Sequence, residues 1–117
     1  MTRRIPYWYF LIIPSLMWAV GFMLNDVVIS ANNNQMPVFM PGGCPLDTFD
    51  SDLIHTCMTH ATRLKFLADW LIINGPHIDV ASPGDFFMWG GEYLLWPCFA
   101  MWVALMIADR RRPAWEI

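Results

Sequence analysis

The sequence contains little charge. Only 15% of its 117 residues are charged, against about 25% in an ordinary soluble domain. Apolar side chains fill the deficit, because 56% of the residues are hydrophobic and seven Trp, eight Phe and nine Met are among them. This composition excludes a disordered tail. The net charge of −3 provides no basic face, which argues against a nucleic-acid partner.

Motifs of the common enzyme classes are also absent. The chain has no Gly-x-Ser-x-Gly, no P-loop and no paired metal-binding motif, so we expect no enzymatic activity. A soluble fold of this length could hardly bury so much apolar surface. We therefore expect much of that surface to face lipid or a protein partner, and residues 1–117 to form a single membrane domain.

Two long apolar stretches predict two membrane-spanning helices. Residues 7–24 carry no charge and begin with aromatic residues typical of the lipid–water boundary. The second stretch, residues 86–108, follows Ser-Pro-Gly-Asp at residues 82–85. That sequence suits a helix start, because Ser82 can cap the helix and Asp85 can return a carboxylate to the free amides. A cleaved signal peptide is the alternative interpretation of the first stretch.

The charge distribution predicts an orientation. Residues 25–85, which we call the outer segment, hold seven acidic and two basic residues, a formal charge of −5. Basic residues gather instead near both chain ends: Arg3, Arg4, Arg110, Arg111 and Arg112. Because Lys and Arg are enriched in cytoplasmic loops, we expect both termini in the cytoplasm and the outer segment outside.

The outer segment divides into a turn-rich loop and a predicted helix. Residues 32–50 show no periodicity and contain three prolines and a Gly-Gly pair, which enforce turns. Farther along, a mostly apolar set of residues recurs at spacings of three and four, typical of one helical face: Leu53, Cys57, His60, Leu64, Leu67 and Leu71. We therefore predict a helix over residues 53–73, interfacial or re-entrant because it is too short to span. The predicted fold class is an all-α membrane protein, a two-span helical hairpin with an outer loop and this middle helix.

Three short motifs stand in order along the chain. They are Asn-Asn-Asn-Gln-Met-Pro-Val at residues 32–38, Phe-Leu-Ala-Asp at residues 66–69 and Ser-Pro-Gly-Asp at residues 82–85. In this order they resemble a family of uncharacterised bacterial multi-pass membrane proteins, whose pattern has glycine where this chain has Asn33, Asn34 and Ala68. The resemblance implies a shared membrane hairpin and outer loop in a bacterial inner (plasma) membrane, and it implies no activity.

Polar side chains at the outer ends of the spans are the first candidate site. Glu92 lies within the second stretch, where an ionisable residue is a functional candidate by default. Asp85, Asp26 and Asn25 lie at the same outer level, and carboxylates there could offer oxygen ligands to a cation. The structural alternative is that Glu92 reaches the interface or bonds a neighbouring helix.

The cysteines and histidines of the outer segment provide two further candidates. Cys44 and Cys57 can form a disulfide on the oxidising side of a membrane. The soft side chains of His55, Cys57, Met58 and His60 suit copper or zinc, although their spacing matches no strong metal signature and a hydrogen-bonded interfacial histidine is the alternative. The sequence identifies no cofactor; haem or another pigment would need a histidine as axial ligand.

We expect a small integral-membrane accessory or structural subunit of a larger membrane complex, because two helices cannot bury this much apolar surface against each other. Its partners would be the lipid bilayer and other membrane-protein subunits or further copies of the chain. One alternative is an outer-side cation- or metal-binding membrane protein. A second alternative is a membrane-active effector that inhibits a host complex.

Overall fold

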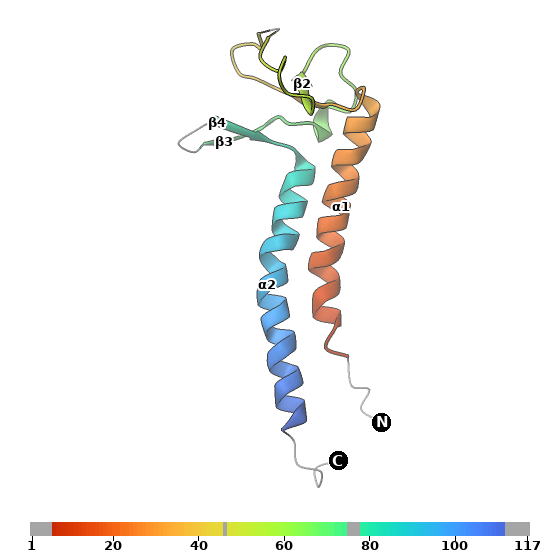
Figure 1. Cartoon of the computed structure of the whole chain (residues 1–117), viewed down its shortest axis with the longest axis vertical. Coiled ribbons are helices and arrows are strands. Elements are labelled where there is room, and N and C mark those ends of the chain that lie inside the picture. The colour runs from red at the N-terminus through yellow and green to blue at the C-terminus, as the bar shows by residue number, and fades with distance from the viewer. Residues whose placement is uncertain (1–5, 46, 75–77, 112–117) are drawn as a thin grey trace.

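The computed structural model of the chain describes residues 6–45, 47–74 and 78–111. Two long helices, α1 (Tyr9–Ala31) and α2 (Pro83–Arg110), lie side by side, and a small head of strands and loops covers one end of the pair (Figure 1). The start of α1 and the end of α2 lie at the opposite end (Figure 1). The molecule is elongated as a result, with extents of 72 × 31 × 21 Å.

Both helices are long and apolar enough to cross a membrane. Each is longer than its apolar stretch, since α1 continues past residue 24 to Ala31 and α2 already begins at Pro83. The predicted helix start at residues 82–85 is confirmed. The Ser82 hydroxyl oxygen accepts from the amide of Asp85 over 3.1 Å, and the Asp85 carboxylate accepts from the amide of Ser82 over 3.0 Å. This reciprocal capping satisfies amides that a helix N-terminus leaves free.

Small residues form the seam between the two helices. Gly21 of α1 lies against Gly84, and Gly91 of α2 lies against the backbone of Pro14 and Trp18. A Cβ atom on Gly91 would lie 2.8 Å from the backbone nitrogen of Trp18, which is closer than real side chains pack. The two helices therefore approach backbone to backbone, as in small-residue packing of membrane helices.

The head consists of short strands. β1 (Met36–Val38) pairs in parallel with β2 (His55–Cys57), and β3 (Leu71–Asn74) pairs antiparallel with β4 (Ile78–Ala81). A short 3-10 helix, η1 (Lys65–Leu67), lies between β2 and β3. The prediction of an interfacial or re-entrant helix over residues 53–73 is therefore wrong, and the purely all-α fold class is wrong for the head.

The helix prediction from the spacing failed because the residues concerned belong to several separate elements. Leu53 is 86% exposed, whereas Leu64 and Leu67 pack against a small core of Val28, Met36 and Ala68. Leu64 has a φ of 54°, a left-handed conformation that a right-handed helix does not contain. Val28 belongs to α1, so this core also fastens the head to the end of that helix.

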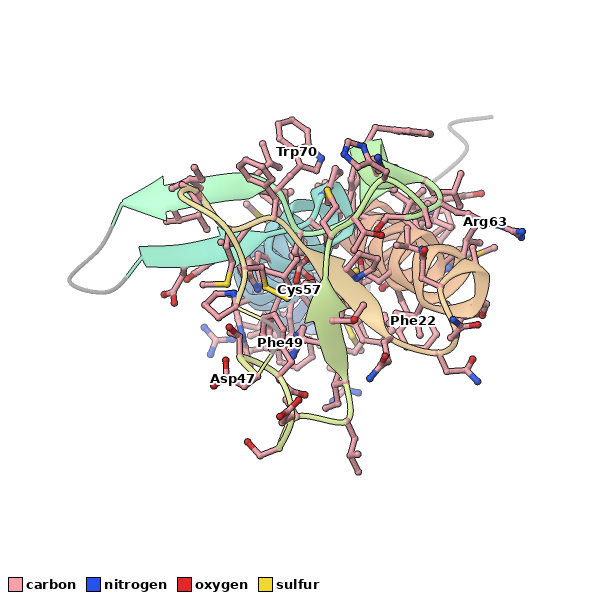
Figure 2. The ribbon with its side chains drawn as sticks, turned by 90° about the horizontal axis from the view of Figure 1, so that it is seen from above. Phe22, Asp47, Phe49, Cys57, Arg63 and Trp70 are labelled. Atoms are coloured by element: carbon pink, nitrogen blue, oxygen red, sulfur yellow. A yellow bond between two sulfur atoms is a disulfide. The ribbon has the colours of Figure 1, made fainter. Side chains whose placement is uncertain are left out.

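Seen from above, the head lies over the ends of the two helices (Figure 2). Cys57 and Phe49 lie towards the middle of this view, while Trp70 and Arg63 lie towards its rim (Figure 2). Cys57 is joined by a disulfide to Cys44, with 5.9 Å between the Cα atoms, so the turn-rich loop is tied covalently to β2.

Substitution of Gly91 tests the seam. Gly91→Ala is expected to destabilise the hairpin by about 1–3 kcal/mol, because the added methyl meets backbone that cannot give way. Gly90→Ala is the matched control, since its Cβ would meet only the flexible end of Met17, at 2.9 Å. Denaturant unfolding of the two purified variants in mild detergent measures the difference. Equal stability of the two variants would mean that the helices do not meet at Gly91.

Candidate functional site

The three motif segments meet where the head joins the helices. In the first, Asn33 and Asn34 have φ angles of 56° and 61°. This left-handed backbone is adopted most readily by glycine and, among other residues, by asparagine. The two asparagines therefore provide a turn in a conformation that glycine adopts most readily. Ala68 has a φ of −81°, which places no demand on residue type.

Backbone hydrogen bonds join the first motif to the second. The amide of Asp69 donates to the carbonyl of Pro37 over 3.0 Å, and the amide of Phe39 donates to the carbonyl of Asp69 over 2.7 Å. Strand β1 therefore pairs with β2 along one edge and with Asp69 along the other. This pairing fixes the backbone of Asp69 and with it the direction of the side chain.

A cluster of three polar side chains joins the third motif to α1. Asn25 donates from Nδ2 to the Asp85 carboxylate over 2.8 Å and accepts at Oδ1 from the Ser82 hydroxyl over 2.7 Å. Ser82 is fully buried, and the other two side chains are half-buried. We call Asn25, Ser82 and Asp85 the junction cluster. Its amide, hydroxyl and carboxylate satisfy one another, so the cluster holds α1 to the start of α2.

The remaining polar candidates of the two helices lie outside the junction cluster. Asp26 is exposed beside it. Glu92 lies two turns farther along α2, where it lines a hollow of about 300 Å³ at the helix seam together with Pro14, Ser15, Trp18, Gly91 and Leu95. The structure therefore brings Asn25 and Asp85 together and leaves Asp26 and Glu92 apart from them.

The predicted soft-metal cluster does not assemble. Cys57 is bound in the disulfide and offers no thiolate. The Nδ1 atom of His55 lies 2.6 Å from Oδ2 of Asp52, and His60 is exposed. Within the described ranges, no group of three or more His, Cys, Asp or Glu side chains is placed to hold a metal ion. The third cysteine, Cys98, is free and half-buried in α2.

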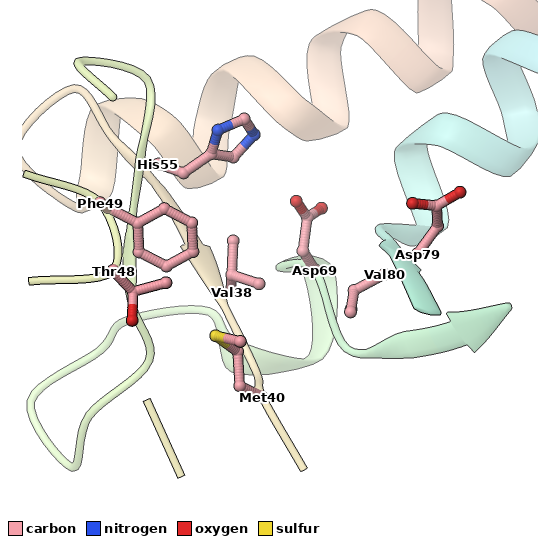
Figure 3. A pocket seen from close by; sticks show the side chains of 8 residues that line it. All are labelled: Val38, Met40, Thr48, Phe49, His55, Asp69, Asp79 and Val80. Carbon is pink, nitrogen blue, oxygen red and sulfur yellow. The ribbon is translucent and has the colours of Figure 1, made fainter. Parts of the chain in front are cut away.

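A pocket of about 260 Å³, which we call the head pocket, lies among β1, β2 and β4 (Figure 3). Its lining combines apolar side chains with two carboxylates, an imidazole and a hydroxyl. The lining residues are Val38, Met40, Thr48, Phe49, His55, Asp69, Asp79 and Val80. The Asp69 carboxylate points into the space between His55 and Asp79 (Figure 3). The rings of Phe49 and His55 lie with their centroids 6.0 Å apart along one side.

Asp69 is the most unusual group in this pocket. It is 7% exposed, and its Oδ1 has no hydrogen-bond partner among the residues that the structure describes. Burial raises the pKa of Asp69 to about 6, with a further contribution from the Asp85 carboxylate and an opposing one from His55. A buried carboxylate without a donor costs free energy. Such a group is therefore a candidate for function as opposed to stability.

The pKa of Asp52 is shifted in the opposite direction from that of Asp69. The hydrogen bond with His55 is the main cause that lowers the pKa of Asp52, and the amide of Ile54 contributes in the same direction. An ionised carboxylate only accepts hydrogen bonds, so the Nδ1 atom of His55 is the donor in this pair. In the neutral imidazole, Nε2 is then left as an acceptor.

The sequence did not indicate Asp69 or Asp79 as site residues. No local pattern separates Asp79 from the other acidic residues of the outer segment. Burial of Asp69 depends on its pairing with β1, which is distant in the sequence. Its position as the last residue of the second motif was the one available signal.

The pH dependence of stability tests the state of Asp69. The raised pKa of Asp69 means that the folded protein holds the proton of this carboxyl group more tightly than the unfolded chain does. Ionisation of Asp69 therefore lowers the free energy of unfolding. This loss is absent below about pH 4, grows as the pH rises towards 6 and reaches its full size above pH 6. Asp69→Asn is expected to exceed the wild type in stability by on the order of 2 kcal/mol at pH 7.5, and to match it near pH 4. Denaturant unfolding at the two pH values measures this, and a variant that is less stable at pH 7.5 contradicts it.

Comparison with known proteins places this junction in a family. No curated protein and no solved structure matches the chain. The model of a family of unknown function, DUF5317, matches residues 7–96. That range contains α1, the head, the start of α2 and all three motif segments. The resemblance to an uncharacterised family is thereby confirmed. The chain belongs to DUF5317, a family of unknown function.

Proposed function

We propose that the chain is a small integral-membrane subunit whose helix pair docks against other membrane helices. Glu92 carries the proposal. Its side chain is exposed on α2 and is followed by Tyr93 at 80% and Trp96 at 70% exposure. Its carboxylate has no hydrogen-bond or ion-pair partner among the described side chains.

The position of Glu92 makes lipid an unfavourable neighbour. It is nine residues after Pro83, which corresponds to about 13 Å along the helix axis. With the start of α2 at the membrane boundary, this depth lies well inside a hydrocarbon core about 30 Å thick. A carboxylate at such a depth costs several kcal/mol and normally pairs with another polar group or faces a water-filled space. A polar group on a partner helix meets this requirement.

The surface around Glu92 suits such a partner. The seam contains small residues, so the large apolar side chains of both helices point outwards. Exposed ones include Ile13, Leu16, Trp18, Phe22, Met23, Tyr93 and Trp96. Lipid can cover these side chains, whereas the hollow that Glu92 shares with Ser15 and Trp18 offers a polar contact beside an aromatic one. The partner in this proposal is another membrane subunit or a second copy of the chain, and neither catalysis nor nucleic-acid binding is part of its role.

We also propose that the head lies outside a bacterial plasma membrane and that both chain ends lie in the cytoplasm. The basic residues near the ends and the −5 charge of residues 25–85 support this orientation. The Cys44–Cys57 disulfide supports it as well, because disulfides persist on the oxidising side of a membrane.

A second candidate function, binding of a cation at the outer side, is favoured by one observation. It is the buried Asp69 carboxylate, which has an oxygen without a hydrogen-bond donor in the described part of the head.

Docking through Glu92 is tested by the mass of the intact assembly. The wild-type chain, extracted from its native membrane in mild detergent, is expected to carry a stoichiometric partner in native mass spectrometry. Glu92→Leu and Glu92→Gln are expected to reduce the assembled fraction several-fold, because interhelical polar contacts contribute about 0.6–2 kcal/mol. Asp26→Asn is the control, since Asp26 is exposed at the head end of α1. A wild-type monomer, or full assembly of Glu92→Leu, contradicts the proposal.

A further inference from the structure

We propose that the head pocket binds a small organic ammonium ion, with the carboxylate of Asp69 as the partner of the ammonium group. The proposal names the ligand of the second candidate function and rests on that function. It is independent of docking through Glu92, which lies on α2 outside the head.

The ionisable groups of the pocket select a hydrogen-bond donor. Asp69 and Asp79 contribute carboxylates, which only accept when ionised. His55 uses Nδ1 to donate to Asp52, so this ring nitrogen is not available to Asp69. A ligand that carries several donors and a positive charge complements the two carboxylates. A primary ammonium has three N–H donors and no acceptor.

The unpaired carboxylate is held in place by its own backbone. Both the amide and the carbonyl of Asp69 are bonded to the strand segment at Pro37 and Phe39, so the backbone fixes the direction in which the side chain leaves it. The carboxylate is buried and directed into the pocket (Figure 3). An ammonium group would supply the missing donor and compensate the buried charge in one contact.

A metal ion fits this lining less well. Calcium takes six to eight oxygen ligands, whereas the pocket has two carboxylates and the Thr48 hydroxyl. In the described part of the chain, no group of three or more His, Cys, Asp or Glu side chains is placed to hold a metal ion. An ammonium group requires no such coordination sphere.

The rest of the lining suits an apolar body on the ligand. Val38, Met40, Phe49 and Val80 provide apolar surface. The face of an aromatic ring such as Phe49 also attracts a cation within about 6 Å. A volume of about 260 Å³ lies just below the range of about 300–1,000 Å³ usual for ligand pockets. The ligand class is therefore a small amine with an aliphatic or aromatic group.

Three probes separate charge from shape. The full-length chain, labelled with 15N in lipid nanodiscs, is titrated with benzylammonium, with the neutral benzyl alcohol and with Ca²⁺. Benzylammonium is expected to cause saturable shifts of the amide signals of Val38, Asp69 and Val80 at millimolar concentration. Benzyl alcohol is expected to bind at least about tenfold more weakly, because it cannot replace a charge-assisted hydrogen bond.

Two variants assign the binding to Asp69. Asp69→Asn keeps the shape of the side chain and is expected to weaken benzylammonium binding at least about tenfold. Asp26→Asn, which lies outside the pocket, is expected to bind as the wild type does. Because the Asp69 side chain forms no hydrogen bond through Oδ1, its replacement does not threaten folding, and the stability of each variant is measured in parallel.

Four results would overturn the inference. They are no saturable shift with benzylammonium, equal affinity for the alcohol, unchanged binding by Asp69→Asn, and saturation of the same signals by Ca²⁺ instead of the amine. If benzylammonium caused no saturable shift but the wild-type chain still carried its partner, the proposal of docking through Glu92 would stand. Loss of assembly in Glu92→Leu with amine binding retained would separate the two proposals in the other direction.

Discussion

The hydrogen-bonded junction cluster of Asn25, Ser82 and Asp85 is the interaction on which the rest of the structure depends. Ser82 and Asp85 would cap α2 in any context, but Asn25 also binds both of them from α1. Gly84 lies directly against the Asn25 side chain, so the contact tolerates no larger residue there. One set of side chains therefore starts α2 and fixes its position relative to α1.

The fixed position of the two helices has consequences in both directions along them. Towards the chain ends, it aligns Gly91 with the backbone of Pro14 and turns the large apolar side chains outwards. Towards the head, it places the start of α2 close enough to Asp69 for the Asp85 carboxylate to raise the pKa of Asp69. A purely structural head would not need a buried carboxylate without a hydrogen-bond donor at this point. That is why we assign Asp69 to binding and Glu92, on the opposite side of the junction, to docking.

The sequence predicted those elements whose signals are local. Hydropathy over some twenty residues indicated both helices, and residues 82–85 indicated the cap of α2. The strands of the head could not be predicted from local signals, because β1 and β2 have three residues each and pair across a long loop. The left-handed φ of Leu64, which excludes a continuous helix, has no sequence signal. The burial of Asp69 likewise follows from its pairing with β1, which is distant in the sequence. Glu92, in contrast, is an ionisable residue within the second apolar stretch and could be identified from the sequence.

Amide hydrogen exchange on Asn25→Ala tests most directly whether the junction cluster positions the head. In lipid nanodiscs, this variant loses both bonds from α1 to the start of α2, while the backbone bonds of β1 to Asp69 lie in the head and are not altered directly. The account predicts that the amides of Asp69 and Phe39 exchange at least about tenfold faster than in the wild type, as expected for a loss of about 1.4 kcal/mol. Exchange that accelerates only around residue 25, with the head amides unchanged, would contradict it.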